Sequence, residues 1–225
     1  MFEHGITHVS LANNHALDFG ESGLENTKKV LQANNIVPMG TPNNIASSSL
    51  AYIELATSTI SVIAIHAVAV DPELDQIADL LERAQERAQY HVVYIHWGDE
   101  YVSTHNQRQQ SMARQLIDAG ADAVIGHHPH VVQDIQLYRG KPIFYSLGNF
   151  VFDQYFSQAV QEGLLLELSF TNDATLYRLV PVTSVGSRTR PRVMTGYERH
   201  QFLESLATRS HQSLFSNIRN GLIKI

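Results

Sequence analysis

The sequence predicts a mixed α/β fold, because segments with the pattern of strands alternate with segments with the pattern of helices along most of the chain. The strand-like segments are rich in Val and Ile, and the helical segments place apolar residues three and four positions apart. The 225 residues, 44% of them hydrophobic, suffice to bury a sizeable core. We expect one main domain over residues 1–186, followed by a loop and a C-terminal helical tail over residues 187–225.

The expected elements follow one another along the chain. A strand over 6–12 precedes an amphipathic helix over 21–34, and two strand-like runs, 50–55 and 60–65, form a plausible hairpin. Residues beyond about Ser210 carry little pattern, so we expect them to fray. The remaining expected elements are helices over 73–89, 107–119 and 197–207, and strands over 91–96, 123–126, 143–147, 163–170 and 174–182.

Charge and composition exclude several classes of function. The chain has 16 Lys and Arg against 22 Asp and Glu, a net charge of -6, which disfavours nucleic acid as a partner. There is no cysteine, so any metal must be held by His, Asp, Glu or Asn. No apolar run approaches the roughly 18 residues of a membrane span, and the first residues lack the pattern of a signal peptide. We therefore expect no signal or transmembrane segment in this chain.

Three patches with metal-type ligands stand where predicted strands end, which is where open α/β sheets place their ligands. Together they predict one metal site that is assembled by folding. The patches are Ala12-Asn13-Asn14-His15, His96-Trp97-Gly98-Asp99-Glu100 and Gly126-His127-His128-Pro129-His130.

The third patch is the strongest of the three. In an extended segment alternate side chains share a face, so His128 and His130 are expected to point at one site and His127 away from it. Two imidazoles that share a face suit a metal centre. The alternative is that the two histidines flank a turn and form only local hydrogen bonds.

The other two patches are weaker when each is taken alone. His96 follows an apolar strand, but a histidine at a strand end is more often a loop or core residue than a ligand. Asp99 and Glu100 are further ligands, groups that orient His96, or residues of a solvated turn. Of these alternatives we favour a candidate catalytic residue that orients His96 for Glu100 and a solvated turn residue for Asp99. The patch Asn13-Asn14-His15 offers a hard amide oxygen next to a histidine that could act as a proton donor, although Asn is also common in turns.

These patches and a fourth block occur in a family order over most of residues 6–153. The blocks are Ser10-Leu11-Ala12-Asn13-Asn14-His15-Ala16-Leu17-Asp18-Phe19-Gly20, His96-Trp97-Gly98-Asp99-Glu100-Tyr101, Gly126-His127-His128-Pro129-His130-Val131-Val132-Gln133 and Tyr145-Ser146-Leu147-Gly148-Asn149-Phe150-Val151-Phe152-Asp153. The set resembles the calcineurin-like metallophosphoesterase superfamily. Within that superfamily it is most similar to the bacterial CapA/PgsA-type capsule and poly-γ-glutamate biosynthesis proteins.

The resemblance implies a four-layer α-β-β-α sandwich and a set of site residues. Asn14, His96, His128 and His130 would be metal ligands, and His15 would be a general acid or a phosphate contact. In such enzymes two metals, roughly 3.5–4 Å apart, clamp a phosphate and activate a bridging water. The segment 148–150 is expected to shape the rim of the site or to form a tight turn.

The chain departs from the superfamily pattern at its start. That pattern begins with an aspartate-bearing strand and a second acidic or amide-bearing motif, both of which we expect to be missing upstream of Asn14. The fold would then be N-terminally incomplete, and unpaired strand edges would favour instability or self-association. Without the bridging carboxylate we expect a single, weakly held divalent metal or none, with manganese, iron and zinc equally suited to the ligands.

Three functions are consistent with these observations. The first is an accessory protein of capsule or poly-γ-glutamate biosynthesis at the cell envelope, extracytoplasmic by resemblance, acting with other membrane subunits of capsule synthesis. The second is a metal-dependent phosphoesterase that hydrolyses a phosphate mono- or diester. The third is a metal-poor binding scaffold, since a fold does not determine a function. The expected ligand is an anionic polymer or a phosphate-containing substrate, and not nucleic acid.

Overall fold

The structure is a computed structural model that describes residues 4–68, 70–171 and 173–225. The chain divides into two compact units, Met1–Trp97 with Met112–Val124 and Gly98–Ser111 with Ile125–Ile225. Each unit contains both helices and strands, which confirms the predicted mixed α/β class. The expected domain boundary between residues 186 and 187 stays a prediction.

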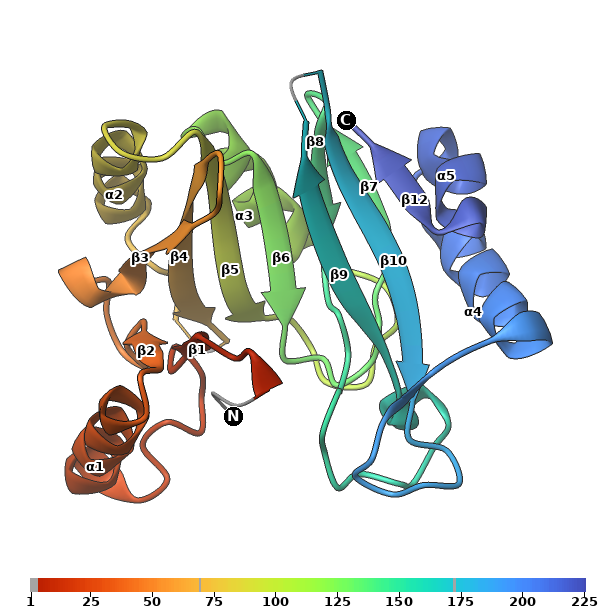
Figure 1. Ribbon diagram of the computed structural model, residues 1–225, viewed down its shortest axis with the longest axis horizontal. Coiled ribbons are helices and arrows are strands. Elements are labelled where there is room, and N and C mark those ends of the chain that lie inside the picture. Colours follow the sequence, from red (N-terminus) through yellow and green to blue (C-terminus); the bar gives the residue numbers. More distant parts are fainter. Residues whose placement is uncertain (1–3, 69, 172) are drawn as a thin grey trace. The chain divides into compact units, whose positions relative to one another are not determined.

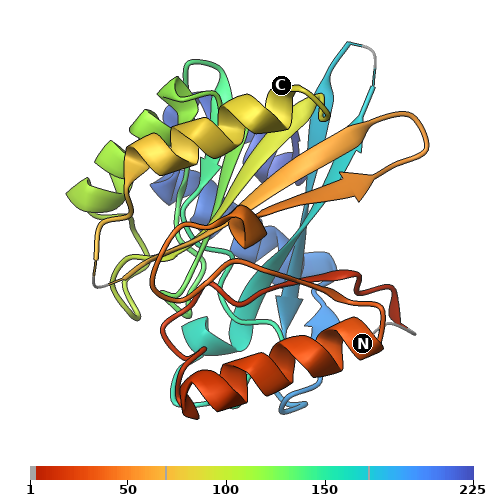
Figure 2. The same ribbon diagram turned by 90° about the vertical axis from the view of Figure 1, so that its left-hand side faces the viewer.

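The first unit begins with a short parallel strand pair and the helix that connects its strands. β1 (His8–Ser10) pairs with β2 (Val37–Met39), and α1 (Gly20–Ala33) packs beside them (Figures 1 and 2). The sequence did not indicate β2, because Pro38 is disfavoured in strand interiors, although a short edge strand tolerates it. A small apolar cluster holds α1 in place and consists of Leu11, Leu24, Leu31 and Ile36.

The main sheet of the first unit contains the predicted hairpin. The 3-10 helix η2 (Ser47–Ser49) leads into β3 (Leu50–Glu54), which pairs antiparallel with β4 (Thr59–Ala67). β4 in turn pairs in parallel with β5 (Tyr90–Trp97), and α2 (Leu74–Gln85) connects the two strands across one face (Figure 2). The apolar side chains buried here include Ile63, Ile65, Ile77, Leu81, Val93 and Ile95.

Two elements contribute residues to both units, namely α3 (Gln107–Asp118) and β6 (Ala123–His127). In the second unit, β7 (Ile135–Tyr138) and β8 (Lys141–Phe144) form an antiparallel hairpin. Its turn residues Arg139 and Gly140 have φ angles of 48° and 75°, as a tight hairpin turn requires.

A second antiparallel sheet is built around β10 (Thr175–Thr183). One edge of β10 pairs along its length with β9 (Glu162–Phe170), which follows the 3-10 helix η3 (Ala159–Gln161). The other edge pairs with β11 (Arg192–Val193) and β12 (Leu222–Lys224) (Figure 1). β10 is therefore a central strand of this sheet.

The end of the chain is ordered, so the expectation that residues beyond Ser210 fray is wrong. The predicted helix near 197–207 is present as α4 (Gly196–Arg209), and η4 (Gln212–Leu214), α5 (Phe215–Asn220) and β12 follow it. Burial of apolar side chains on β10 and these elements explains the order, because each removes apolar surface from water. These side chains include Tyr177, Leu179, Leu203, Leu206, Ile218 and Ile223. No helix in the described ranges has the length and apolar character needed to cross a bilayer.

Candidate metal centre

Three side chains of the second unit form a group that could hold a metal ion. Glu100, His128 and His130 each place one ligand atom within 4.8 Å of the other two. Glu100 Oε1 lies 3.9 Å from His130 Nε2, and the side chains of His130 and Glu100 are 13% and 42% exposed. His128 is buried. Two imidazoles and one carboxylate fit zinc, manganese or iron, and the partial exposure of Glu100 leaves the group open to solvent on that side.

A turn, rather than an extended strand, brings the two histidines together. β6 ends at His127, and the residues that follow adopt left-handed backbone, with φ 102° at His128 and 61° at His130. The expectation that His128 and His130 share the face of an extended segment is therefore wrong in its geometry, although their rings do lie 6.1 Å apart. His127 stays outside the group, and desolvation lowers its pKa to about 4, so its ring is neutral at physiological pH.

Asn149 determines which nitrogen of His130 faces the group. Asn149 Nδ2 donates to the backbone oxygen of Val160 at 3.0 Å, so its Oδ1 must face His130. That oxygen lies 2.9 Å from His130 Nδ1, which must therefore carry the proton. His130 Nε2 is left with its lone pair, which is the form a metal requires. The sequence pointed only to a rim or a turn at 148–150, because a contact across 19 residues leaves no periodic signal.

Aromatic side chains surround His130. The Tyr101 ring stacks on it with centroids 5.8 Å apart and an angle of 25°, and the Phe152 ring lies 5.0 Å away. Phe156 packs edge-on against Tyr101 at 5.1 Å. Apolar rings around a ligand histidine restrict solvent access and limit the orientations that its ring can adopt.

The loop that carries Glu100 is tied to the histidine loop and to a buried amide. Tyr101 N donates to the backbone oxygen of Pro129 at 2.8 Å. Gln133, which is 1% exposed, donates to the backbone oxygens of Val102 and Thr104 at 2.9 and 3.1 Å. Gln109 Nε2 completes the arrangement by donating to Gln133 Oε1 at 2.9 Å. Buried amides whose hydrogen bonds are satisfied in this way hold a loop in one conformation.

A histidine and an aspartate close the far end of the same loop. The backbone N of His105 donates to Asp134 Oδ1 at 2.9 Å, and its Nδ1 lies 2.8 Å from Asp134 Oδ2. The His105 ring also stacks on Tyr145, with centroids 4.0 Å apart. None of these contacts was expected from the sequence. Together with Gln133, they hold the 102–105 segment in one conformation.

In the first unit, three predicted site residues are joined by hydrogen bonds. His96 Nε2 lies 2.8 Å from Asn14 Oδ1, Asn14 Nδ2 lies 3.3 Å from His15 Nε2, and His15 Nδ1 lies 2.9 Å from Asp18 Oδ2. Because a carboxylate only accepts, His15 Nδ1 donates to Asp18. His15 Nε2 then accepts from the Asn14 amide nitrogen, and the Asn14 amide oxygen accepts from His96 Nε2. Two ligands of one cation lie about 3 Å apart, so the Asn14–His96 distance also fits joint coordination.

His66 is a further histidine beside this group that the sequence did not single out. It stands opposite His96 in the β4–β5 register, and the two rings are 6.0 Å apart. Its Nδ1 donates to the backbone oxygen of Pro42 at 2.5 Å, while its buried Nε2 has no hydrogen-bond partner among the described residues. The predicted residues thus lie in two groups, Asn14, His15 and His96 in one unit and Glu100, His128 and His130 in the other. Their roles as ligands and acid stay predictions.

Two curated proteins from Bacillus are similar to most of the chain. The PGA biosynthesis protein CapA of Bacillus subtilis is 34% identical over 194 residues, which cover 79% of this chain and 50% of that protein. The capsule biosynthesis protein CapA of Bacillus anthracis is 32% identical over 198 residues, which cover 80% of this chain and 48% of that protein. The chain therefore spans about half the length of the curated relatives it matches.

The fold is also similar to that of solved structures. A candidate 5′-nucleotidase from Staphylococcus aureus aligns with a TM-score of 0.51 at 13% sequence identity, covering 95% of this chain and 42% of that one. At this identity the likeness concerns the fold alone, and it supports the expected metallophosphoesterase-type α/β architecture. Residues 1–154 of the 225 match the model of the bacterial capsule synthesis protein PGA_cap. The chain therefore belongs to the PGA_cap family of bacterial capsule synthesis proteins.

Proposed function

We propose that this chain is an accessory protein of capsule or poly-γ-glutamate biosynthesis, that it acts at the cell envelope outside the cytoplasmic membrane, and that it uses a bound divalent cation. Family membership carries the proposal, because both Bacillus relatives are named for biosynthesis of PGA or capsule. The other membrane subunits of capsule synthesis are its proposed partners.

The proposed ligands in the second unit are Glu100, His128 and His130, for manganese, iron or zinc. A cation bound there would act as a Lewis acid toward a phosphoryl or carbonyl oxygen. Asn149 holds the proton on His130 Nδ1 and keeps Nε2 available as a ligand. This hydrogen bond supports the proposal, because the ring is already in the form that ligation requires.

In the first unit, Asn14 and His96 are the proposed ligands and His15 is the proposed proton donor. Asp18 orients the His15 ring by accepting from Nδ1, and Asn14 occupies Nε2 in the described arrangement. The side chain of His15 is 64% exposed, so it is accessible to a substrate from solvent. Because Nδ1 already carries the ring proton that Asp18 accepts, donation from Nε2 would require a second proton on the His15 ring, and the Asn14 amide would have to turn away from Nε2.

A second candidate function is hydrolysis of a phosphate mono- or diester. The observation that favours it is the combination of two imidazoles and a carboxylate on a fold of this type. Such a donor set can hold a catalytic cation, whereas a pure scaffold has no need of it.

Polymer production and phosphate turnover together test the proposal. The chain would replace the matching segment of Bacillus subtilis CapA in a strain that lacks its own copy, and secreted poly-γ-glutamate would be measured. The purified chain would be assayed for metal content and for turnover of aryl phosphate mono- and diesters. Variants H128A and E100Q would be compared with D99N, a change beside Glu100 at an exposed carboxylate that bonds to Asn106 instead.

Restored polymer production that depends on His128, without phosphate turnover, is the expected result. Turnover that is abolished by H128A would instead establish the phosphoesterase. Polymer production that H128A leaves unchanged, together with purified protein that contains no metal, would favour the scaffold.

A further inference from the structure

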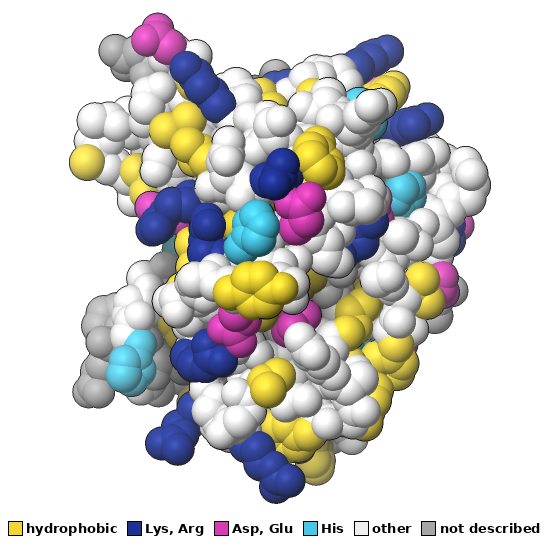
Figure 3. Space-filling view, turned by 90° about the vertical axis from the view of Figure 1, so that its right-hand side faces the viewer, with side chains coloured by type: hydrophobic (Ala, Val, Ile, Leu, Met, Phe, Trp, Pro, Cys, Tyr) yellow, Lys and Arg dark blue, Asp and Glu magenta, His cyan; other side chains and the backbone are white. Residues whose placement is uncertain are grey.

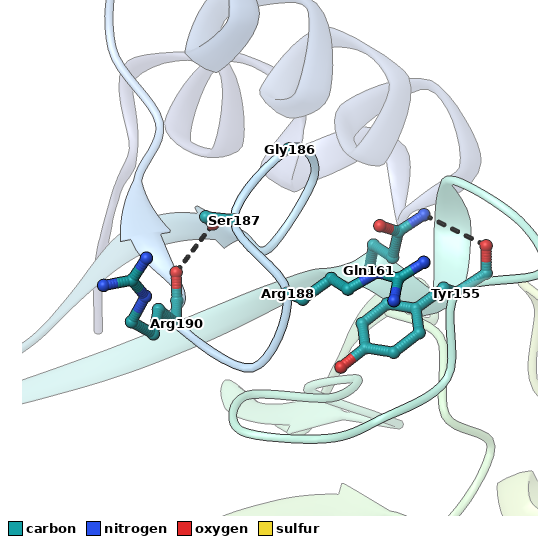
Figure 4. A pocket seen from close by; sticks show the side chains of 6 residues that line it. All are labelled: Tyr155, Gln161, Gly186, Ser187, Arg188 and Arg190. Atoms are coloured by element: carbon teal, nitrogen blue, oxygen red, sulfur yellow. Dashed lines mark hydrogen bonds between the residues drawn. The ribbon is translucent and has the colours of Figure 1, made fainter.

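A pocket of the second unit combines two arginines with an aromatic ring and polar groups. It has a volume of about 610 Å³ and lies between the loop that follows β10 and the segment that precedes β9 (Figure 4). The residues that line it are Tyr155, Gln161, Gly186, Ser187, Arg188 and Arg190. Nothing in the predicted metal chemistry uses any of them.

The loop that carries the arginines is anchored at its base and braced internally. Ser184 N donates to the backbone oxygen of Gln161 at 2.8 Å, which ties the loop to η3. The hydroxyl of Ser187 donates to the backbone oxygen of Arg190 at 2.8 Å, as Figure 4 shows. Arg188 and Arg190 therefore leave one braced turn, separated by a single residue, and both line the same pocket.

The two guanidinium groups lack the compensation that other arginines have. In the described ranges neither contacts a carboxylate, and the side-chain contact of Arg188 is with the Tyr155 ring at 5.1 Å. No residue that lines the pocket is acidic. Four other arginines of the described ranges pair with glutamates, and on the face that includes α4 and α5 basic and acidic side chains are interspersed (Figure 3). These pairs are Arg87–Glu54, Arg178–Glu167, Arg192–Glu198 and Arg219–Glu204.

Figure 4 shows Arg188 pointing toward Tyr155 and Gln161 and Arg190 pointing to the other side of the same turn, so the rim of the pocket presents two guanidiniums that are unpaired among the described residues, in a chain of net charge -6. Guanidinium groups recognise carboxylates through paired hydrogen bonds, and both arginines are exposed, so a ligand can reach them without desolvating a closed cavity. A polymer that carries a carboxylate on every unit can contact both arginines at once, and the two linked contacts together give a higher affinity than either contact alone.

We propose that the Arg188–Arg190 pocket binds carboxylates of an anionic polymer segment, with poly-γ-glutamate as the ligand class. The inference rests on the proposed function for the identity of the polymer, whereas the site itself rests on the pocket. Tyr155 packs against Arg188 and limits the directions in which its guanidinium can turn. The pocket would hold the polymer independently of the residues proposed to bind metal.

Direct binding tests the proposal separately from polymer production. A short γ-linked oligoglutamate with a fluorescent label would be titrated with the purified full chain at low ionic strength. R188Q and R190Q are each expected to weaken binding about three- to tenfold, and the double variant more than either. R178Q removes the same charge from an exposed, ion-paired position of β10 and should leave the affinity unchanged. Thermal unfolding would verify that all variants are folded, since none of these side chains is buried.

Several outcomes would contradict the proposal that the Arg188–Arg190 pocket binds an anionic polymer. One is wild-type protein that does not bind the oligomer, and another is an arginine double variant that binds it as well as wild type does. Displacement by inorganic phosphate at concentrations where free glutarate has no effect would assign a phosphate site instead. Stronger displacement by a single-stranded oligonucleotide of equal charge would assign a nucleic-acid site. In each case the strain assay would still decide the proposed function, because it measures polymer production whether or not this pocket binds the polymer.

Discussion

Asn149 Oδ1 accepts a hydrogen bond from His130 Nδ1 at 2.9 Å, and the other end of the same amide donates to a backbone carbonyl. The two bonds leave only one orientation for the amide and only one proton position on the imidazole. A residue that the sequence placed on a rim thus fixes the chemical form of a proposed ligand.

Replacement of Asn149 by alanine is expected to weaken metal binding roughly 10- to 100-fold, because His130 loses the acceptor that fixes its ring. The measurement is a competition titration of the purified chain with a chelator of known affinity. N220A provides the control, since Asn220 lies on the exposed surface of the same unit and its side chain makes no described contact with the group. Equal affinities for N149A and N220A would show that the orientation of His130 does not matter.

The charge of Glu100 is expected to contribute to cation binding, and E100Q should reduce the affinity about tenfold or more, because a carboxylate oxygen is exchanged for a neutral amide. D99N changes the neighbouring carboxylate, which accepts from Asn106 at 2.6 Å, and should alter the affinity by less than about twofold. A larger effect for D99N than for E100Q would exclude Glu100 from the ligand set.

Gly163 is expected to tolerate no side chain. A Cβ atom there would lie 2.0 Å from the backbone oxygen of Asn149, which cannot move aside without disturbing the His130 hydrogen bond. We expect G163A to lower the free energy of unfolding by about 3 kcal/mol and to weaken metal binding as well. G140A is the control, because its Cβ would meet open space and only its φ of 75° opposes alanine, at a cost of about 1 kcal/mol. Chemical denaturation of both variants checks the difference.

Glu162 is expected to destabilise the fold at neutral pH. Burial raises the pKa of its carboxyl group above the ordinary 4.5, and the hydrogen bond from Gln158 and the charge of Arg209 only partly oppose this. A raised pKa means that the folded state holds the Glu162 proton more tightly than the unfolded state does. The stability that Glu162 contributes in acid is therefore lost as the pH rises above 4.5. E162Q should therefore raise the free energy of unfolding by ~0.5 kcal/mol at neutral pH, an amount limited by solvent screening.

The effect of E162Q should vanish below pH 4.5, where the carboxyl group is protonated in both states. Glu198 offers a comparison of opposite sign, because its hydrogen bond with Arg192 lowers its pKa. E198Q should slightly destabilise the fold at neutral pH and have no effect in acid. Denaturation curves at neutral and acidic pH check both predictions. A shift of stability in the same direction for both variants at neutral pH would contradict the assigned pKa directions.

The sequence predicted those elements whose signal is local. The hairpin of β3 and β4, the helices α1 and α3, and strand β5 were found within a few residues of their ends, because apolar periodicity along each segment reflects the face that it buries. β12 was missed, since its three residues carry no periodicity and it forms only by pairing with a strand over 40 residues away. Local propensity cannot report a partner at that separation.

The site shows the same division. Residue type and strand-end position indicated the three patches, and the family resemblance singled out Asn14, His96, His128 and His130 among them. The sign of φ at His128 and His130 is not encoded in hydropathy. The contacts of Gln133 and Asp134 with the 102–105 loop also could not be predicted from the sequence, because the burial of an amide or carboxylate depends on hydrogen-bond partners elsewhere in the chain.

The left-handed turn of His128 and His130 has a consequence for which ions can be accepted. Backbone in this region is unfavourable for residues other than glycine, and it persists where surrounding contacts enforce it, as the Tyr101–Pro129 hydrogen bond does here. A turn held in this way cannot widen or contract freely to match an ion. At the proposed metal centre, discrimination among divalent cations should then follow ionic radius and ligand number, so that calcium, which needs longer bonds and more oxygen ligands, is rejected even at high concentration.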